Sequence, residues 1–165
     1  MSIQFRNVYW LWLTVLVILA DQVTKQLIVK AMDWYDVKPL LPHFNLVHLR
    51  NTGAAFSMFN ESSPLVFVGI GVAVSVGILI WLRKNPRGQM LVAVALSLIM
   101  GGALGNVIDR VTRGYVVDFI DFYVGGWHFA AFNVADTAIS VGAGLMVLDM
   151  LIEMFRKNPA PSASE

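Results

Sequence analysis

Four apolar stretches, each close to the length of a membrane-spanning helix, constrain this sequence more than any other feature. A bilayer core about 30 Å thick requires about 20 apolar residues in a helix that rises about 1.5 Å per residue. Apolar residues make up 57% of the chain and charged residues only 14%, which is more apolar surface than one soluble core of this size could bury. We therefore expect an integral membrane protein with spans at about residues 8–29, 65–82, 90–108 and 132–152.

Strand patterns occur between the expected spans. Residues 43–50 and 115–124 alternate apolar and polar side chains, and Gly125-Gly126 predicts a hairpin turn after the second segment. The fold class that follows is mainly α and integral to the membrane. It has four transmembrane helices and a small β-containing extracytoplasmic region formed by the outer loops.

We expect one domain. The first stretch follows the basic Arg6, as in a signal peptide, but it lacks a small-x-small cleavage site and its helical pattern continues past the apolar run. We interpret it as an uncleaved span. Residues 1–157 then form a single membrane domain with outer loops 30–64 and 109–131, and the tail 158–165 is expected to be disordered.

Charge and cysteine content exclude several functions. A net charge of +1 offers no basis for binding nucleic acid. The absence of cysteine excludes disulfides, thiolate metal sites and a cysteine nucleophile. The three histidines, His43, His48 and His128, lack metal-ligand spacing and are interpreted as interfacial or hydrogen-bonding residues.

The distribution of basic residues predicts the orientation. Cytoplasmic loops carry an excess of lysine and arginine. The loop at residues 83–89 and both ends of the chain are basic, with Arg6, Arg83, Lys84, Arg87, Arg156 and Lys157. We therefore expect both termini on the cytoplasmic side and the two long loops on the outer side.

This orientation brings polar residues from three spans to one depth. Ionisable residues within spans are costly, so such a cluster is a hypothesis for a functional site. The residues at the outer ends of the first, third and fourth spans are Asp21, Lys25, Asn106, Asp109, Arg110, Asn133 and Asp136.

Asp118 and Asp136 are the candidates for catalysis. Asp118 lies in a predicted outer strand and Asp136 at the outer mouth of the fourth span, so the hairpin between them can bring them face to face. Two neighbouring carboxyls share a proton, and one can then act as general base on water while the other acts as general acid for the leaving amine. The alternative is that Asp118 solvates a loop and Asp136 caps the fourth span.

Other polar groups have competing interpretations. Asp21 and Lys25, four residues apart on a helix, are interpreted as a buried salt bridge rather than as direct catalysts. Asp109 and Arg110 form a structural pair, or Arg110 holds a substrate carbonyl or a lipid headgroup. A Ser57–Lys25 dyad is a weaker alternative, since nothing in the sequence brings the two residues together.

Five segments occur in the order found in a known family. They are Asp21-Gln-Val-Thr-Lys25, Asn51-Thr-Gly-Ala-Ala-Phe56, Gly101-Gly-Ala-Leu-Gly-Asn-Val-Ile-Asp-Arg110, Val117-Asp-Phe119 and Phe132-Asn-Val-Ala-Asp136. Each motif alone has little specificity, but together they cover nearly the whole chain. The chain resembles bacterial lipoprotein signal peptidase, or signal peptidase II, a family of membrane aspartic proteases.

The resemblance implies catalytic roles for Asp118 and Asp136. It implies site-shaping or supporting roles for Asn51, Gly53, Asn106, Asp109, Arg110, Asn133, Asp21 and Lys25. The implied substrate is a prolipoprotein that carries diacylglycerol on a cysteine, cut on the amino-terminal side of that cysteine without a metal or cofactor. We expect a monomer, in contact with membrane lipids, in the bacterial cytoplasmic (inner) membrane. Its active site would lie near the outer, periplasmic interface.

Two other classes of protein compete with the peptidase. A small ion-coupled transporter would also use intramembrane Asp and Lys. However, the charges cluster at one depth rather than along a pathway, and no inverted repeat is visible. A structural membrane subunit would not need so many polar groups at the outer ends of its spans.

Overall fold

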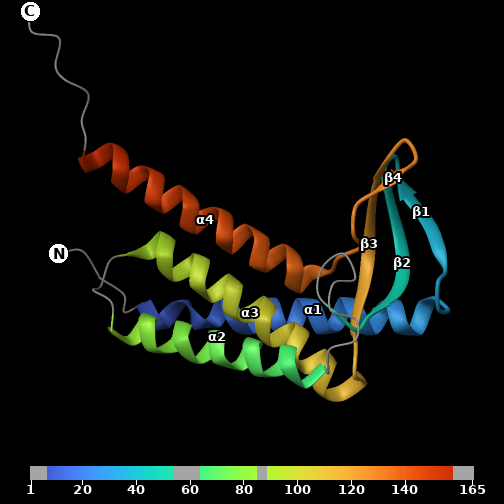
Figure 1. Cartoon of the computed structure of the whole chain (residues 1–165), viewed down its shortest axis with the longest axis horizontal. Coiled ribbons are helices and arrows are strands. Elements are labelled where there is room, and N and C mark those ends of the chain that lie inside the picture. The colour runs from blue at the N-terminus through green and yellow to red at the C-terminus, as the bar shows by residue number, and fades with distance from the viewer. Residues whose placement is uncertain (1–6, 54–63, 85–88, 158–165) are drawn as a thin grey trace, which may run out of the picture.

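The computed structural model describes residues 7–53, 64–84 and 89–157. Within these ranges four helices are long and apolar enough to cross a membrane. They are α1 (Leu11–Ala31, after the 3-10 turn Asn7–Trp10), α2 (Pro64–Lys84), α3 (Met90–Arg113) and α4 (Val134–Lys157). Figure 1 shows them running alongside one another, with a small sheet standing across one end. This arrangement confirms the predicted fold class.

All four helices continue past their predicted C-terminal ends, α3 and α4 by the most. Helix α3 continues past residue 108 to Arg113, so Asp109 and Arg110 lie within the helix rather than in the predicted outer loop 109–131. Gly114 ends it in a left-handed conformation (φ 81°), which is the usual C-terminal signal of a helix. Helix α4 likewise runs past residue 152 to Lys157.

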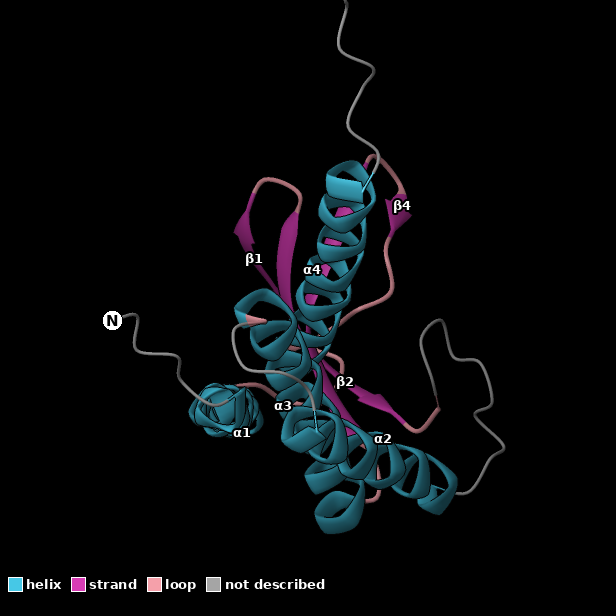
Figure 2. Ribbon diagram, turned by 90° about the vertical axis from the view of Figure 1, so that its left-hand side faces the viewer, coloured by secondary structure: helices cyan, strands magenta, loops and turns pink. Residues whose placement is uncertain are grey.

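Helix α3 packs against each of the other three helices (Figure 2). Small residues allow these close approaches, as is common in membrane bundles. A Cβ atom added to Gly102 would lie 2.3 Å from the carbonyl oxygen of Ala135 at the start of α4. One added to Gly101 would lie 2.7 Å from Cβ of Val17 on α1. The backbone of α3 therefore lies directly against its neighbours.

The sheet is antiparallel, with the order β1-β2-β3-β4. Its strands are β1 (Val37–Leu41), β2 (Phe44–Asn51), β3 (Val116–Val124) and β4 (Trp127–His128). The predicted strands at residues 43–50 and 115–124 and the Gly125-Gly126 hairpin are confirmed. Strand β1 was not predicted, because all five of its residues are exposed and no buried face marks it in the sequence.

The base of the sheet is attached to two helices. Val117 and Phe119 of β3 pack against Ile28 and Met32 at the end of α1. Asp118 lies between them in sequence, so its side chain points to the opposite face, where Leu49 of β2 is its partner across the strands. The fold thereby directs Asp118 toward the start of α4.

Candidate active site

Asp118 is buried in the face of β3 that looks toward α4. Only 3% of the residue is exposed. Its carboxyl accepts hydrogen bonds from Asn133 Nδ2 at 2.7 Å and from Asn51 Nδ2 at 2.9 Å. The alternative that Asp118 solvates a loop is therefore wrong.

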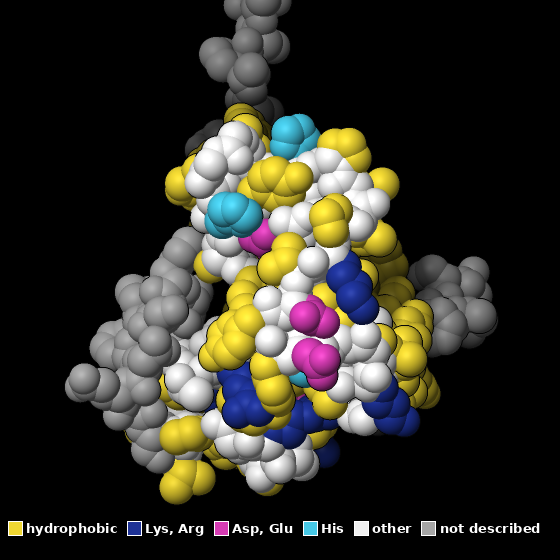
Figure 3. All heavy atoms as spheres, turned by 90° about the vertical axis from the view of Figure 1, so that its right-hand side faces the viewer, with side chains coloured by type: hydrophobic (Ala, Val, Ile, Leu, Met, Phe, Trp, Pro, Cys, Tyr) yellow, Lys and Arg dark blue, Asp and Glu magenta, His cyan; other side chains and the backbone are white. Residues whose placement is uncertain are grey.

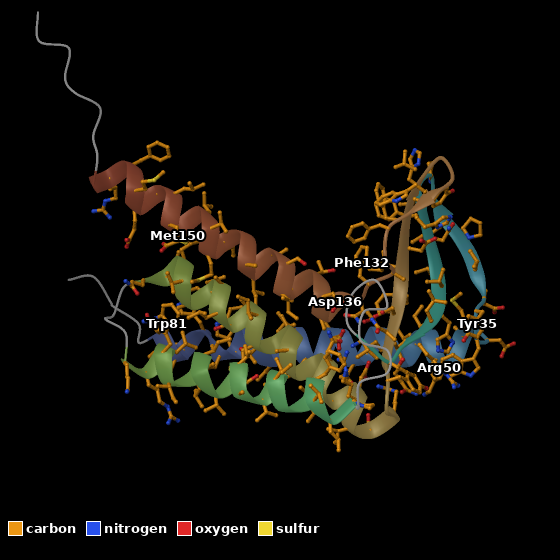
Figure 4. The ribbon with its side chains drawn as sticks, in the orientation of Figure 1. Tyr35, Arg50, Trp81, Phe132, Asp136 and Met150 are labelled. Atoms are coloured by element: carbon orange, nitrogen blue, oxygen red, sulfur yellow. The ribbon has the colours of Figure 1, made fainter. Side chains whose placement is uncertain are left out.

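Asp136 lies in the first turn of α4, at the junction of helices and sheet (Figure 4). Asn133 N–H donates to its Oδ2 at 3.2 Å, and Asp136 N–H donates to Asn133 Oδ1 at 2.9 Å. This reciprocal pair resembles a capping box, so Asp136 does cap the fourth span, as the alternative to a catalytic role described. Its other oxygen accepts a hydrogen bond from Asn106 Nδ2 at 2.8 Å.

Asn133 joins the two carboxyls. Its side-chain amide donates to Asp118, while its backbone amide and side-chain oxygen engage Asp136. Burial, together with the nearby charge of Asp136, raises the pKa of Asp118 to about 7, against the lowering effect of the Asn51 and Asn133 amides. Asp118 can therefore hold a proton near neutral pH, which is the state that a general acid requires.

Lys25 lies at the centre of a buried charge network. Its Nζ is 2.8 Å from Asp21 Oδ2 and 3.0 Å from Asp109 Oδ2, and the three side chains are 0% exposed. The predicted Asp21–Lys25 salt bridge is confirmed. The described partners of Asp109 include Lys25 and Arg113 but not Arg110, which differs from the expected Asp109–Arg110 pair.

The network reaches Asp136 through Asn106. Lys25 Nζ donates to Asn106 Oδ1 at 2.9 Å, which leaves the amide Nδ2 of Asn106 to face Asp136. Asp21 Oδ1 accepts the backbone N–H of Ala135 at 2.9 Å, within the first turn of α4. The charges thus hold the start of α4 in place and fix the direction of the Asn106 amide.

Arg110 and Gly53 lie on another side of the site. Arg110 Nη2 donates to the carbonyl oxygen of Gly53 at 2.7 Å, and Gly53 N–H donates to Asn51 Oδ1 at 3.0 Å, closing the predicted tight turn. The Arg110 guanidinium lies 4.8 Å from the ring centroid of Phe67. Its Nε is buried and has no hydrogen-bond partner among the described residues.

A cavity of about 610 Å³ adjoins the polar residues. It is walled by α2, α3, α4, the end of β2, the start of β3 and the segment before α4. Its lining is mostly apolar, while Arg110 and Asp136 are its charged members. The lining residues are Asn51, Gly53, Phe67, Asn106, Arg110, Val116, Phe129, Ala130, Ala131, Phe132, Asp136, Thr137, Ile139, Ser140 and Val141. A site of this composition suits a peptide backbone flanked by apolar groups.

The sequence analysis missed two residues of the charge network. Gln22 Nε2 donates to Asp21 Oδ2 and to Asp109 Oδ1, both at 3.1 Å, and Arg113 pairs with Asp109. Arg113 could have been found from its spacing of four residues after Asp109. Ser57, the weaker nucleophile candidate, lies outside the described residues. Within the described ranges no cluster of three or more His, Asp or Glu could hold a metal ion.

The sequence profile described as Signal peptidase (SPase) II matches residues 13–152. The chain belongs to this family. It is 47% identical over 146 residues to the lipoprotein signal peptidase of Shewanella pealeana, covering 87% of this chain and 86% of that protein. It is also 47% identical over 151 residues to the Escherichia coli O157:H7 protein of the same name, covering 90% of this chain and 92% of that protein.

Two solved structures of bacterial membrane enzymes have the same fold. One superposes with a TM-score of 0.87 at 32% identity, covering 96% of this chain and 97% of the other. The second has a TM-score of 0.80 at 34% identity, with coverages of 92% and 97%. The resemblance noted in the sequence is confirmed. The protein is an aspartic peptidase of the membrane that cleaves signal peptides from lipoproteins, and the matches give no support to an ion-coupled transporter.

Proposed function

We propose that Asp118 and Asp136 are the catalytic dyad of this peptidase. The observation that carries the proposal is that two carboxyls, the buried Asp118 and the half-buried Asp136, are both hydrogen-bonded to Asn133, with Asp136 lining the cavity. Asp118 holds the shared proton. Asp136 is ionised, because it faces the positive end of the α4 dipole and the donors Asn133 N–H and Asn106 Nδ2.

In the proposed hydrolysis, one aspartate acts as the general base and the other as the general acid. Asp136 takes a proton from a water molecule as its oxygen attacks the scissile carbonyl carbon. Asp118 gives its proton to the leaving nitrogen as the carbon–nitrogen bond breaks, which yields a carboxylic acid and a free amine. The proton gained by Asp136 passes to Asp118 and restores the starting state of the dyad.

The remaining candidate residues support this chemistry from outside the dyad. Asn51 and Asn133 position Asp118, and Lys25 orients Asn106 toward Asp136. Arg110 lines the cavity, where its guanidinium can donate to a substrate carbonyl oxygen. Asp21 and Asp109 neutralise Lys25, while Gly53 sets the turn that carries Asn51.

The proposed substrate is a prolipoprotein with diacylglycerol on a cysteine, cut on the amino-terminal side of that cysteine. The cavity supports this assignment, since its mostly apolar walls lie beside membrane-length helices and can receive both a lipid chain and an apolar signal segment. A single chain supplies both carboxyls and the cavity, so we propose that the enzyme acts as a monomer that contacts membrane lipids.

We further propose that the enzyme lies in the bacterial cytoplasmic (inner) membrane, with both termini cytoplasmic and the sheet and dyad at the periplasmic interface. The basic end of α2 supports this orientation. The chain has no cysteine, so single-cysteine variants report it directly. A membrane-impermeant maleimide should label Tyr35→Cys in intact spheroplasts, and Lys84→Cys only after permeabilisation. The reverse pattern would overturn the orientation.

The dyad is tested with purified enzyme and a lipidated precursor whose cleavage shifts its mobility in a gel. Asp118→Asn and Asp136→Asn should each lower the rate by about 100-fold or more, since each removes a proton-transfer group. Asp149→Asn, on α4 but outside the site, is the matched control and should cleave at close to the wild-type rate. Full activity in either dyad variant would refute the proposal.

A further inference from the structure

On the face of the sheet that carries Asp118, the side chains far from the proposed dyad are apolar. Strand register places Phe44 opposite Phe122, Leu41 opposite Phe44, and Trp127 opposite Val124. Residues directly opposite each other share a face, as do alternate residues of one strand, so these side chains lie on the same face as Asp118. We call this set the apolar tip: Leu41, Phe44, Phe122, Val124 and Trp127.

The other face of the same tip is polar. Asn45 Nδ2 donates to Asp121 Oδ2 at 2.9 Å, and His128 Nδ1 lies 2.9 Å from Asp121 Oδ1. The His128 ring stacks on Tyr123, with centroids 5.3 Å apart. Figure 3 views the molecule from this side and shows histidine side chains and an acidic group near its upper end. The tip is therefore amphipathic across its thickness, with one polar and one apolar side.

The protein leaves the apolar tip largely uncovered. Leu41 is 62% exposed, Val124 54% and Trp127 59%. Asp118 faces α4, so the tip faces the side of the sheet from which the helices extend. In Figure 1 the sheet rises past the start of α4, which tilts away from it. The space in front of the tip is thus beside the bundle, where exposed apolar side chains of the helices already indicate lipid.

We propose that the apolar tip docks onto the bilayer, at the boundary between the headgroups and acyl chains of the leaflet beneath the sheet. Contiguous exposed apolar groups on one face of an element indicate a membrane or protein contact. Continuity with the lipid-facing helices selects the membrane, and tryptophan is typical of this depth. The polar side, with Asp121 and His128, then faces water.

Docking would fix the height of the dyad. Among the described residues, Val117 and Phe119 attach the base of the sheet to the end of α1, and the far end of the sheet extends away from this contact. With the apolar tip held by lipid, the sheet has two supports. Asp118, at the base of the sheet, is then held at a constant depth relative to the bilayer surface. This contact is separate from the catalytic residues and does not depend on which side of the membrane the sheet occupies.

Neighbouring residues at the tip provide a matched test. Trp127 is 59% exposed and the His128 side chain 56%, but they point to opposite faces. Each is replaced by cysteine in the cysteine-free chain, labelled with an environment-sensitive nitrobenzoxadiazole dye and placed in nanodiscs of phosphatidylethanolamine and phosphatidylglycerol. Doxyl-labelled lipid should quench most of the Trp127→Cys signal and little of the His128→Cys signal. Aqueous iodide should give the reverse result.

Three results would overturn the proposal. The first is equal iodide quenching at the two positions. The second is protection of the Trp127→Cys dye only after a lipidated precursor is added, which would make the tip a substrate surface. The third is energy transfer between labelled chains in nanodiscs that hold more than one chain, if this transfer is lost when the lipid-to-protein ratio is raised. That result would indicate that a second copy of the chain covers the tip. Circular dichroism of each labelled variant checks that the fold is retained.

Discussion

At the scale of single residues, two side chains of the same type acquire different chemistry from where they lie. Asp118 sits on a strand, and among the described residues its oxygens accept hydrogen bonds from the neutral side-chain amides of Asn51 and Asn133. Asp136 sits at a helix N-terminus, where the backbone itself favours negative charge. The difference between acid and base in the proposed dyad therefore comes from secondary structure.

The raised pKa of Asp118 predicts that replacing this residue with asparagine stabilises the fold by an amount that depends on pH. Its pKa is about 7 in the folded protein against 3.8 unfolded, so between these values the folded state holds a proton that the unfolded state has released. Rising pH therefore destabilises the wild type in this window. Asp118→Asn removes this effect. The free energy of unfolding of the variant relative to wild type should therefore increase from about pH 4 to pH 7, by at most about 4 kcal/mol.

Thermal unfolding in detergent across this pH range measures the effect. A constant difference in melting temperature between Asp118→Asn and wild type would contradict it. Asp149→Asn serves again as the control, and its melting temperature should follow that of the wild type at each pH.

Lys25 should be essential to the fold through its two carboxylate partners. Lys25→Met leaves Asp21 and Asp109 buried without their shared cation, which should cost about 3–5 kcal/mol. Adding Asp21→Asn removes one of the unpaired charges and leaves Asp109 with Arg113. Chemical denaturation should therefore find the double variant more stable than Lys25→Met. A double variant less stable than the single one would show that the charges do not balance in this way.

Single-residue prediction from the sequence succeeded where partners are close in the chain. The Asp21–Lys25 pair follows from helical spacing, and the carboxyl of Asp136 from its place at a helix start. The contact between Lys25 and Asp109 joins different helices, so no local sequence pattern predicts it. For the same reason Arg110 was paired with its neighbour Asp109, whereas its described hydrogen bond to a distant part of the chain is to Gly53.

At the scale of elements, the helices were predictable because hydropathy alone decides which segments enter lipid. Their ends were less so, since α3 continues past its apolar run to Gly114. Strands with one buried face were predictable from alternation, but the fully exposed β1 was not. The contacts between helices depend on particular glycines. Which glycines matter depends on the residues of the neighbouring helix that face them, and the sequence does not specify those neighbours.

The glycines of two helices predict opposite effects for the same substitution. Gly102→Ala places a methyl group against the carbonyl oxygen of Ala135, which must displace the start of α4 and with it Asp136. We expect a loss of about 1–3 kcal/mol in stability and a lower cleavage rate. Gly144→Ala on α4 meets nothing within 4 Å, so it should stabilise the helix by about 0.5–1 kcal/mol with unchanged activity. Equal outcomes in thermal unfolding and cleavage would refute this account of the α3–α4 contact.

At the scale of the whole molecule, the candidate site forms only where the helix bundle and the sheet meet. The helices bring polar groups together at one level of the bundle, and the sheet carries Asp118 over the start of α4. That these groups meet was predictable from the order of the spans. The cavity was not, because it forms where α2, α3, α4 and the segment before α4 meet, and its shape depends on tertiary packing.

The position of the cavity beside lipid-exposed helices predicts that substrate enters sideways from the bilayer. Val141 lines the cavity and is 50% exposed, whereas Val147 is 56% exposed on the same helix but does not line it. Val141→Trp should fill part of the entrance and raise KM for the lipidated precursor by about tenfold, the equivalent of about 1.4 kcal/mol, with little change in kcat. Val147→Trp adds the same side chain to the lipid-facing surface and should leave both constants near wild type. A larger effect at Val147 than at Val141 would mean that substrate reaches the dyad along a different face of α4.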